Sequence, residues 1–163
     1  MVALRLIRLI ESHGNQISET LTKRMLSSKR TTDLQKVSEA ELLSSLQGLL
    51  EHLSEWLLMK TDNDVEQRYH DMGARRSRLG VSLSDSCWAL MMTKECLWEF
   101  LQKQGFLHNP IELYGEIELL SLLDQFFDRA LGYMAEGYEE SARTNADKRR
   151  QKPRELNPVA FAP

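Results

Sequence analysis

Residues 110–148 read PIELYGEIELLSLLDQFFDRALGYMAEGYEESARTNADK, and this stretch decides the fold class. Pro110 suits the first position of a helix, where its missing N–H costs nothing, and no other proline follows before Pro153. Apolar side chains recur at intervals of three and four along the stretch, which is the period of an amphipathic helix. We therefore expect one helix of about forty residues, which spans about 60 Å.

This long helix carries two apolar series that run one residue out of step. The first series is Leu113, Ile117, Leu120, Phe127, Leu131, Met134 and Tyr138, interrupted by Asp124. The second series is Leu119, Leu123, Phe126, Ala130 and Tyr133. A helix of this length is longer than the diameter of a domain of this size. We therefore expect one series to face the core and the other to face a second copy of the chain. We assign the second series to the dimer interface; one helix buried in a monomeric bundle is the alternative.

Capping residues and apolar spacing predict the remaining helices. Their expected ranges are 2–28 with a break at Gly14-Asn15, 33–60, 62–79 and 83–104. Ser38, Thr61 and Ser82 each stand where an N-cap oxygen is needed, with an acidic residue three positions on. Gly80 and Gly105 then end two of these helices. The expected fold is an all-α bundle of about five helices with a long C-terminal helix.

Composition agrees with a single helical domain. The 163 residues are 42% hydrophobic and include only 8 glycines and 4 prolines, too few for a β-sandwich. No apolar run is long enough to span a membrane, and Arg5 and Arg8 interrupt the first apolar segment, so we expect a cytoplasmic protein without a secretory signal. Cys87 and Cys96 lie on opposite sides of one predicted helix and are expected to stay unpaired.

Charge divides the chain into two parts. Residues 1–140 hold 15 Lys and Arg against 22 Asp and Glu, whereas residues 141–163 hold 6 against 2. We interpret residues 1–140 as a helical sensory or interaction domain and residues 141–163 as a basic helix end with a disordered tail. Basic residues at a helix C-terminus are favoured by the helix dipole. The acidic body argues against nucleic acid as a partner.

The sequence contains no motif that names a reaction. Phosphate-binding loops, metal-ligand spacings and nucleophile motifs are all missing, so we assign no catalytic residue and no metal. The histidines are scattered, and His70 is the nearest candidate for a haem ligand. A haem or small-molecule sensor remains an alternative, with a cavity lined by Tyr69, Trp88, Met92 and Phe127. An enzyme whose catalytic groups meet only in the fold is a lower alternative.

The densest local pattern surrounds Gly73 and Arg76. Glycine inside a helix costs about 1 kcal/mol relative to alanine, so Gly73 predicts the close approach of a neighbouring helix. Arg76 shares a helix face with Tyr69 and therefore leans inward, where a guanidinium needs an acidic partner. We expect Asp124 to be that partner. Arg76 as the anchor of an anionic ligand is the alternative.

These residues carry a family resemblance. The order Tyr69-x3-Gly73-x2-Arg76-x3-Gly80-x-Ser82-Leu83 is followed by Leu97-Trp98-Glu99-Phe100-Leu101, and later by Phe126-Phe127-Asp128-Arg129-Ala130 and Gly137-Tyr138-Glu139. Over about residues 1–140 the chain resembles the amino-terminal domain of RsbRD-type proteins. Those proteins are co-antagonists of the RsbT kinase in stressosomes, and similar domains precede bacterial histidine kinases.

The resemblance implies a non-catalytic bacterial sensor or interaction domain, globin-like but without haem. It implies a homodimer whose last helix relays a conformational signal to an output module or signalling partner. The motif residues are then packing residues: Tyr69, Gly73, Arg76, Gly80, Phe127 and Asp128. No output module follows Arg150, so the chain is expected either to act alone or to be the front of a longer protein.

Overall fold

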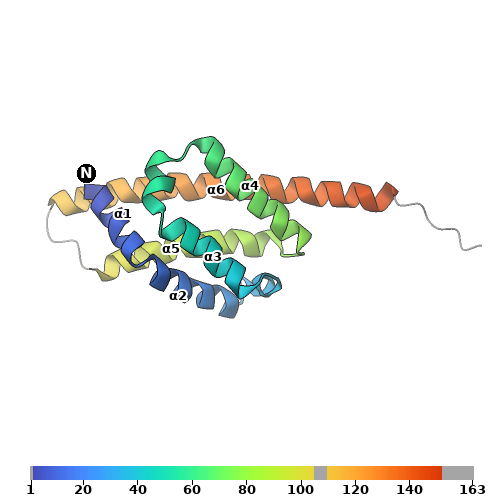
Figure 1. The fold of residues 1–163 in the computed structure, drawn as a ribbon, viewed down its shortest axis with the longest axis horizontal. Coiled ribbons are helices and arrows are strands. Elements are labelled where there is room, and N and C mark those ends of the chain that lie inside the picture. Colours follow the sequence, from blue (N-terminus) through green and yellow to red (C-terminus); the bar gives the residue numbers. More distant parts are fainter. Residues whose placement is uncertain (1, 105–109, 152–163) are drawn as a thin grey trace, which may run out of the picture.

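Six α-helices, one 3₁₀ turn and one π turn make up the described part of the chain, residues 2–104 and 110–151 of a computed structural model (Figure 1). They are α1 (Val2–Ser12), α2 (Gly14–Ser27), η1 (Thr32–Lys36), α3 (Glu39–Leu50), η2 (Glu55–Met59), α4 (Asp62–Arg78), α5 (Leu83–Lys103) and α6 (Pro110–Gln151). These residues include no strand. The all-α prediction and the long C-terminal helix are confirmed, whereas the expected number of about five helices was too low.

The predicted helix starts are built as expected. The Ser38 hydroxyl accepts the Glu41 N–H at 3.1 Å, and the Ser82 hydroxyl accepts the Asp85 N–H at 3.1 Å. Thr61 and Asp64 form a reciprocal capping box. Gly105, which was expected to end a helix, lies outside the described residues. Local side-chain oxygens therefore determine where α3, α4 and α5 begin.

The end of α4 depends on Gly80, which has a φ of +74°. The Gly80 N–H donates to the Ser77 carbonyl at 3.1 Å, and the Val81 N–H donates to the Arg76 carbonyl at 3.0 Å. This pair of bonds is the Schellman motif, which needs a left-handed residue that only glycine adopts without strain. The chain then turns directly into α5.

The single helix predicted over residues 33–60 is wrong. Ser38 has an extended ψ of 142°, which separates η1 from α3, because an N-cap residue cannot itself be helical. Beyond Leu50 the ladder is interrupted again, since the Ser54 N–H donates to the Glu11 carboxylate at 2.7 Å. The Glu11 side chain of α1 therefore binds a backbone N–H that would otherwise continue the helix beyond the end of α3. The break predicted near Gly14 is confirmed, with His13 between α1 and α2.

The elements are arranged around α6 (Figure 1). This helix packs most extensively on α4 and also contacts α1 and α5, whereas α2 packs on α3 and α5. Its final turns project beyond the other helices in Figure 1. The side chains from Ala142 to Gln151 are exposed except for a half-buried Asn145. Within the described residues, no helix is both long enough and apolar enough to cross a membrane.

Candidate functional site

The closest contact between two helices joins α4 to α6. A Cβ atom placed on Gly73 would overlap the Met134 carbonyl oxygen, and one placed on Gly137 would overlap the His70 carbonyl oxygen. Each helix thus contributes one glycine to a backbone-to-backbone contact. From its position inside a helix, Gly73 was expected to allow the close approach of a neighbouring helix, and α6 makes this approach. Gly137 was missed as its counterpart, although the same signal, a glycine inside a helix, was present.

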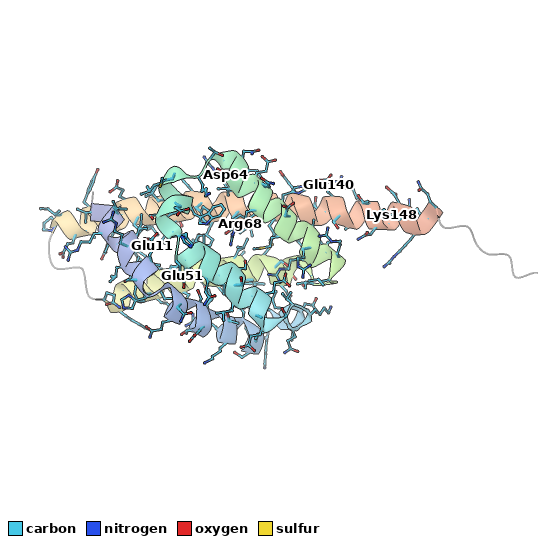
Figure 2. The ribbon with its side chains drawn as sticks, viewed as in Figure 1. Glu11, Glu51, Asp64, Arg68, Glu140 and Lys148 are labelled. Carbon is cyan, nitrogen blue, oxygen red and sulfur yellow. The ribbon has the colours of Figure 1, made fainter. Side chains whose placement is uncertain are left out.

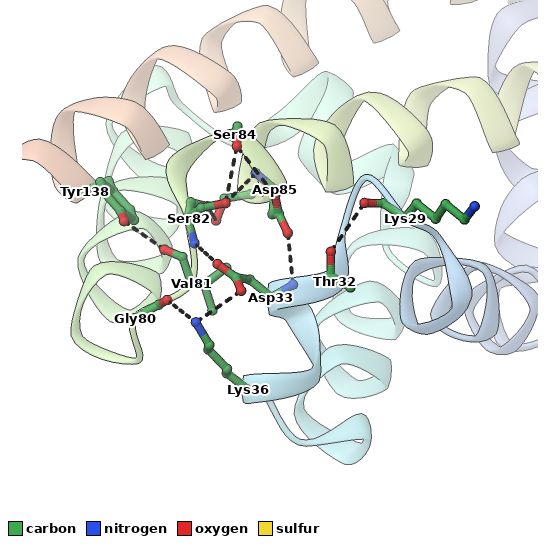
Figure 3. A network of polar contacts seen from close by, with 11 residues as sticks. Lys29, Thr32, Asp33, Lys36, Gly80, Val81, Ser82, Ser84, Asp85 and Tyr138 are labelled. Atoms are coloured by element: carbon green, nitrogen blue, oxygen red, sulfur yellow. Dashed lines mark hydrogen bonds and ion pairs between the residues drawn. The ribbon is translucent and has the colours of Figure 1, made fainter.

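Tyr138, one residue further along α6, ties this contact to the turn between α4 and α5. Its hydroxyl donates to the Val81 carbonyl at 2.8 Å (Figure 3). Val81 is fully buried and directly follows Gly80. The α4–α5 turn is therefore held by α6 from one side.

Carboxylates hold the same turn from the other side (Figure 3). Asp33 in η1 accepts the Ser82 N–H at 2.9 Å and forms an ion pair with Lys36 at 3.1 Å, and both contacts lower the pKa of the Asp33 carboxyl. In return, the Asp33 N–H donates to the Asp85 carboxylate at 2.9 Å. The sequence does not indicate this network, because residues 33 and 82 meet only in the fold.

We call the Gly73–Gly137 contact, the α4–α5 turn and the Asp33 network together the α4–α6 junction. It joins η1, α4, α5 and α6 through contacts that are polar or involve the backbone directly. Such contacts have narrow geometric tolerance.

The expected pairing of Arg76 with Asp124 is wrong. Asp124 instead forms an ion pair with Lys94 of α5 at 3.1 Å, and both side chains are partly exposed. Arg76 is 8% exposed and lines a cavity of about 40 Å³ between α2, α3, α4, α5 and α6. Helical spacing correctly predicted that Arg76 points inward. It could not predict which helix would present a carboxylate.

The second apolar series of α6 faces the core of its own chain. Leu119, Leu123 and Ala130 are at most 1% exposed, and Phe126 is 6% exposed within the single chain. Half-buried Tyr133 donates its hydroxyl to the Asp62 carboxylate at 2.6 Å. The assignment of this series to a dimer interface is therefore corrected. The exposed apolar positions belong instead to the start of α6 and include Leu113 and Ile117 of the first series.

The remaining motif residues divide between core and surface. Tyr69 is buried and packs edge-on against Phe126 at 5.8 Å between ring centroids. Phe127 is buried as well, whereas Asp128 is exposed. Beside Tyr69, the Arg68 guanidinium lies over the Trp56 ring and donates to the Ser45 carbonyl at 2.8 Å; Figure 2 labels it at the centre of the molecule.

Four residues were expected to line a haem or small-molecule cavity: Tyr69, Trp88, Met92 and Phe127. Trp88 lies under the Arg30 guanidinium at 4.1 Å. The cavity beside Arg76 has none of the four expected residues in its lining. His70 of α4 contacts the Glu140 carboxylate of α6 at 2.8 Å; Figure 2 labels Glu140.

A separate cleft of about 350 Å³ lies between α2 and α5. Its lining includes His13, whose ring stacks on Phe100 at 5.3 Å, and an ion pair between Arg24 and Glu99 at 3.1 Å. Buried Cys96 also lines it; desolvation raises the pKa of this thiol and of Cys87, which disfavours the reactive thiolates. Among the described residues, no cluster of His, Cys, Asp or Glu could hold a metal ion.

Comparison with known proteins gives one family. A family model described as the RsbT co-antagonist protein RsbRD N-terminal domain matches residues 15–152. No curated protein and no solved structure matches the chain significantly. The match covers most of the sequence and agrees with the resemblance carried by the residues around Gly73. The globin-like fold stays a prediction.

Proposed function

The chain belongs to the family of RsbT co-antagonist RsbRD N-terminal domains, a stressosome-related signalling family, and from this premise we propose that it is a cytoplasmic, non-catalytic signalling domain whose output element is α6. The course of α6 carries the proposal. This helix is held to α4 at Gly73 and Gly137 and continues as an exposed basic helix to Gln151. Since the backbone contact leaves no room for sliding, displacement of α4 or of the α4–α5 turn would move the exposed end.

Hydrogen exchange tests this relay. Tyr138→Phe removes the bond from α6 to Val81 while keeping the ring in place. A hydrogen bond of this kind contributes about 0.5–1.5 kcal/mol, so we expect amides of residues 79–83, in the α4–α5 turn that the bond holds, to exchange about 2- to 10-fold faster. Tyr114→Phe is the matched control, because Tyr114 is 74% exposed on the same helix. Equal exchange in both variants would contradict coupling through the junction.

We further propose that the domain is a homodimer formed through the start of α6. Four large apolar side chains are exposed within seven residues there: Ile111 at 70%, Leu113 at 47%, Tyr114 at 74% and Ile117 at 57%. A concentration of exposed apolar surface of this kind marks interaction sites on proteins. A symmetric pair would bury this patch on both copies at once. The signalling partner that receives the relay would then meet a paired α6.

Native mass spectrometry tests the dimer. The chain has a mass of 18.9 kDa, and we expect a species of twice that mass. Ile117→Glu should return the protein to a single copy with unchanged helical circular dichroism, because Ile117 makes no part of the buried core. Gln125→Glu adds the same charge at an exposed polar position of α6 and should leave the pairing intact. A monomeric wild type would remove this part of the proposal.

Small-molecule sensing is a second candidate function, favoured by the cleft between α2 and α5. Its volume of about 350 Å³ falls within the range of ligand pockets, and its lining combines an aromatic ring with charged groups. The same spectrum would report any retained ligand mass. Haem is the version tested most directly: a Soret absorption band after reconstitution, lost in His13→Ala or His70→Ala, would support it, and no band in the wild type would exclude it.

A further inference from the structure

The Arg76 side chain is buried without a partner. Its Nη1 atom has no hydrogen-bond partner, and no ion pair joins it to an acid among residues 2–104 and 110–151. The acid with the strongest electrostatic effect on it is Glu41, which is already held by two nitrogens of Arg75. Burial lowers the pKa of Arg76, but a guanidinium stays protonated in proteins. A net positive charge therefore remains in the interior.

The cavity beside Arg76 offers space and polar groups. Its volume of about 40 Å³ is larger than the space of about 10–15 Å³ that is needed to hold one water. Ser45, Ser86 and Thr93 bring hydroxyl groups to its lining. Ser86 and Thr93 now donate to carbonyls one turn earlier in α5, at 3.1 and 2.8 Å. A hydroxyl rotates freely, so each can donate into the cavity instead.

We propose that this cavity is a binding site for a small monovalent anion, either a halide such as chloride or a carboxylate of one or two carbons, held by the Arg76 guanidinium and the Thr93 and Ser86 hydroxyls. Water would satisfy the hydrogen bonds but would leave the buried charge uncompensated, which is costly in a low-dielectric interior. An anion satisfies both requirements. Because Arg76 lies on α4 and Ser86 and Thr93 lie on α5, a bound anion would link these two helices. The proposal does not depend on the signalling function.

Thermal unfolding at constant ionic strength tests the site. Sodium chloride, formate and acetate are each compared with gluconate, whose six-carbon chain is too large for the cavity. If an anion binds, each tenfold increase in its concentration above the dissociation constant should raise the Tm by about 3–5 °C. A rise with chloride identifies a halide site, and a rise with formate or acetate alone identifies a carboxylate site. No rise with any of them, and no carboxylate released when the purified protein is unfolded, would overturn the proposal.

Variants separate binding from general salt effects. Arg76→Met should abolish the anion dependence and still fold, because replacing an unpaired buried charge by an apolar side chain is commonly neutral or stabilising. Arg78→Met removes an equal charge from an exposed position on α4 and should keep the full dependence. Thr93→Val retains the charge but removes one donor, so it should weaken anion affinity severalfold even if Arg76→Met fails to fold. An unchanged anion response in both Arg76→Met and Thr93→Val would contradict the site.

A crystal soaked in sodium bromide supplies the direct observation. Anomalous scattering from bromide next to Arg76 Nη1 would support the halide site, with the same peak missing in Arg76→Met. Water alone at that position in halide, formate and acetate soaks would overturn the proposal.

Discussion

Two glycines determine how near α4 and α6 can approach. Gly73 faces the Met134 carbonyl, and Gly137 faces the His70 carbonyl. On each helix, the glycine and the carbonyl that faces the other glycine are three residues apart, about one turn. Any larger residue would separate the two helices and disturb the buried side chains around them, including Tyr69 and Phe126. The penalty that glycine imposes on helix stability is thereby offset by tertiary packing.

Gly73→Ala should be destabilising despite the better helix propensity of alanine. Forcing a methyl group into this contact costs about 3 kcal/mol, which exceeds the gain in propensity of about 1 kcal/mol. Urea unfolding measures the difference. Gly132→Ala is the matched control, because a Cβ at Gly132 meets open space, and it should stabilise the protein by about 0.5–1 kcal/mol. If both variants gained stability, the close contact would be refuted.

At the scale of elements, α6 uses its two apolar series differently along its length. Leu119, Leu123 and Phe126 anchor it in the core, whereas Leu113 and Ile117 remain exposed. The helix is therefore neither surrounded by its own chain throughout nor divided neatly into an inner and an outer face. This distribution means that substitutions at the exposed start of α6 and at its buried positions should fail in different ways.

Leu123→Ala should lower the free energy of unfolding by about 2–5 kcal/mol at every protein concentration, because the contacts it loses are within one chain. Ile117→Ala should cost about 0.5 kcal/mol or less in the isolated chain. Any larger loss for Ile117→Ala should grow with protein concentration, as expected for weakened pairing. Urea unfolding over a hundredfold concentration range distinguishes the two. A concentration-dependent effect of Leu123→Ala would restore the interface assignment for the second series.

The pairing of α3 with α4 should depend on pH. Arg75 holds Glu41 through two nitrogens, one at 2.6 Å, and lowers the pKa of this carboxyl below its ordinary value of 4.5. A lowered pKa means that the pair stabilises the fold above pH 4.5 and that this contribution is lost as the pH falls through the folded-state value. The difference in urea midpoint between wild type and Glu41→Gln should therefore be present at pH 7 and shrink by pH 3.

Glu39→Gln is the matched control for this pH effect, because Glu39 is an exposed acid in the same first turn of α3. Its effect on the urea midpoint should be smaller at pH 7 than that of Glu41→Gln. Equal midpoints for wild type and Glu41→Gln at pH 7 would show that the exposed pair contributes nothing.

At the scale of the whole molecule, α6 runs through and beyond the bundle (Figure 1). Its 42 residues correspond to about 63 Å, but Gly137 is the last buried residue along the helix. The remaining turns have few packing contacts, and at their end Lys148, Arg149 and Arg150 place positive charge at the negative pole of the helix dipole. The molecule thus consists of a packed body and a protruding charged helix.

Hydrogen exchange of the unmodified protein should reflect this division. Amides of residues 119–137 should exchange only through near-global unfolding, because their side chains are packed in the core. Amides of residues 141–151 should exchange orders of magnitude faster, since fraying there breaks no core contact. Mass spectrometry of peptic fragments measures both. Slow exchange throughout residues 141–151 would show that a second copy or partner covers them.

Local chemistry in the sequence was enough to predict where three helices begin and where one ends. Ser38, Thr61 and Ser82 begin helices and Gly80 ends one, because capping bonds and a positive φ involve residues only a few positions apart. Helical periodicity, by placing Arg76 on the same helix face as Tyr69, correctly predicted that Arg76 leans inward. The error over residues 33–60 arose where Glu11, distant in the sequence, withdraws a backbone donor from the helix ladder.

Only the tertiary structure decided which positions of the two apolar series of α6 face the core, which carboxylate meets which cation, and that Asp33 joins the α4–α5 turn. Helical period defines faces but not their neighbours, and two series one residue apart are equivalent until other helices pack against one of them. Thus Lys94, not Arg76, contacts Asp124, and Arg76 is left in a cavity. The sequence by itself determined the all-α class, the long C-terminal helix and the helix caps, because these depend on residues only a few positions apart; packing between distant helices determined the junction and the unpaired charge.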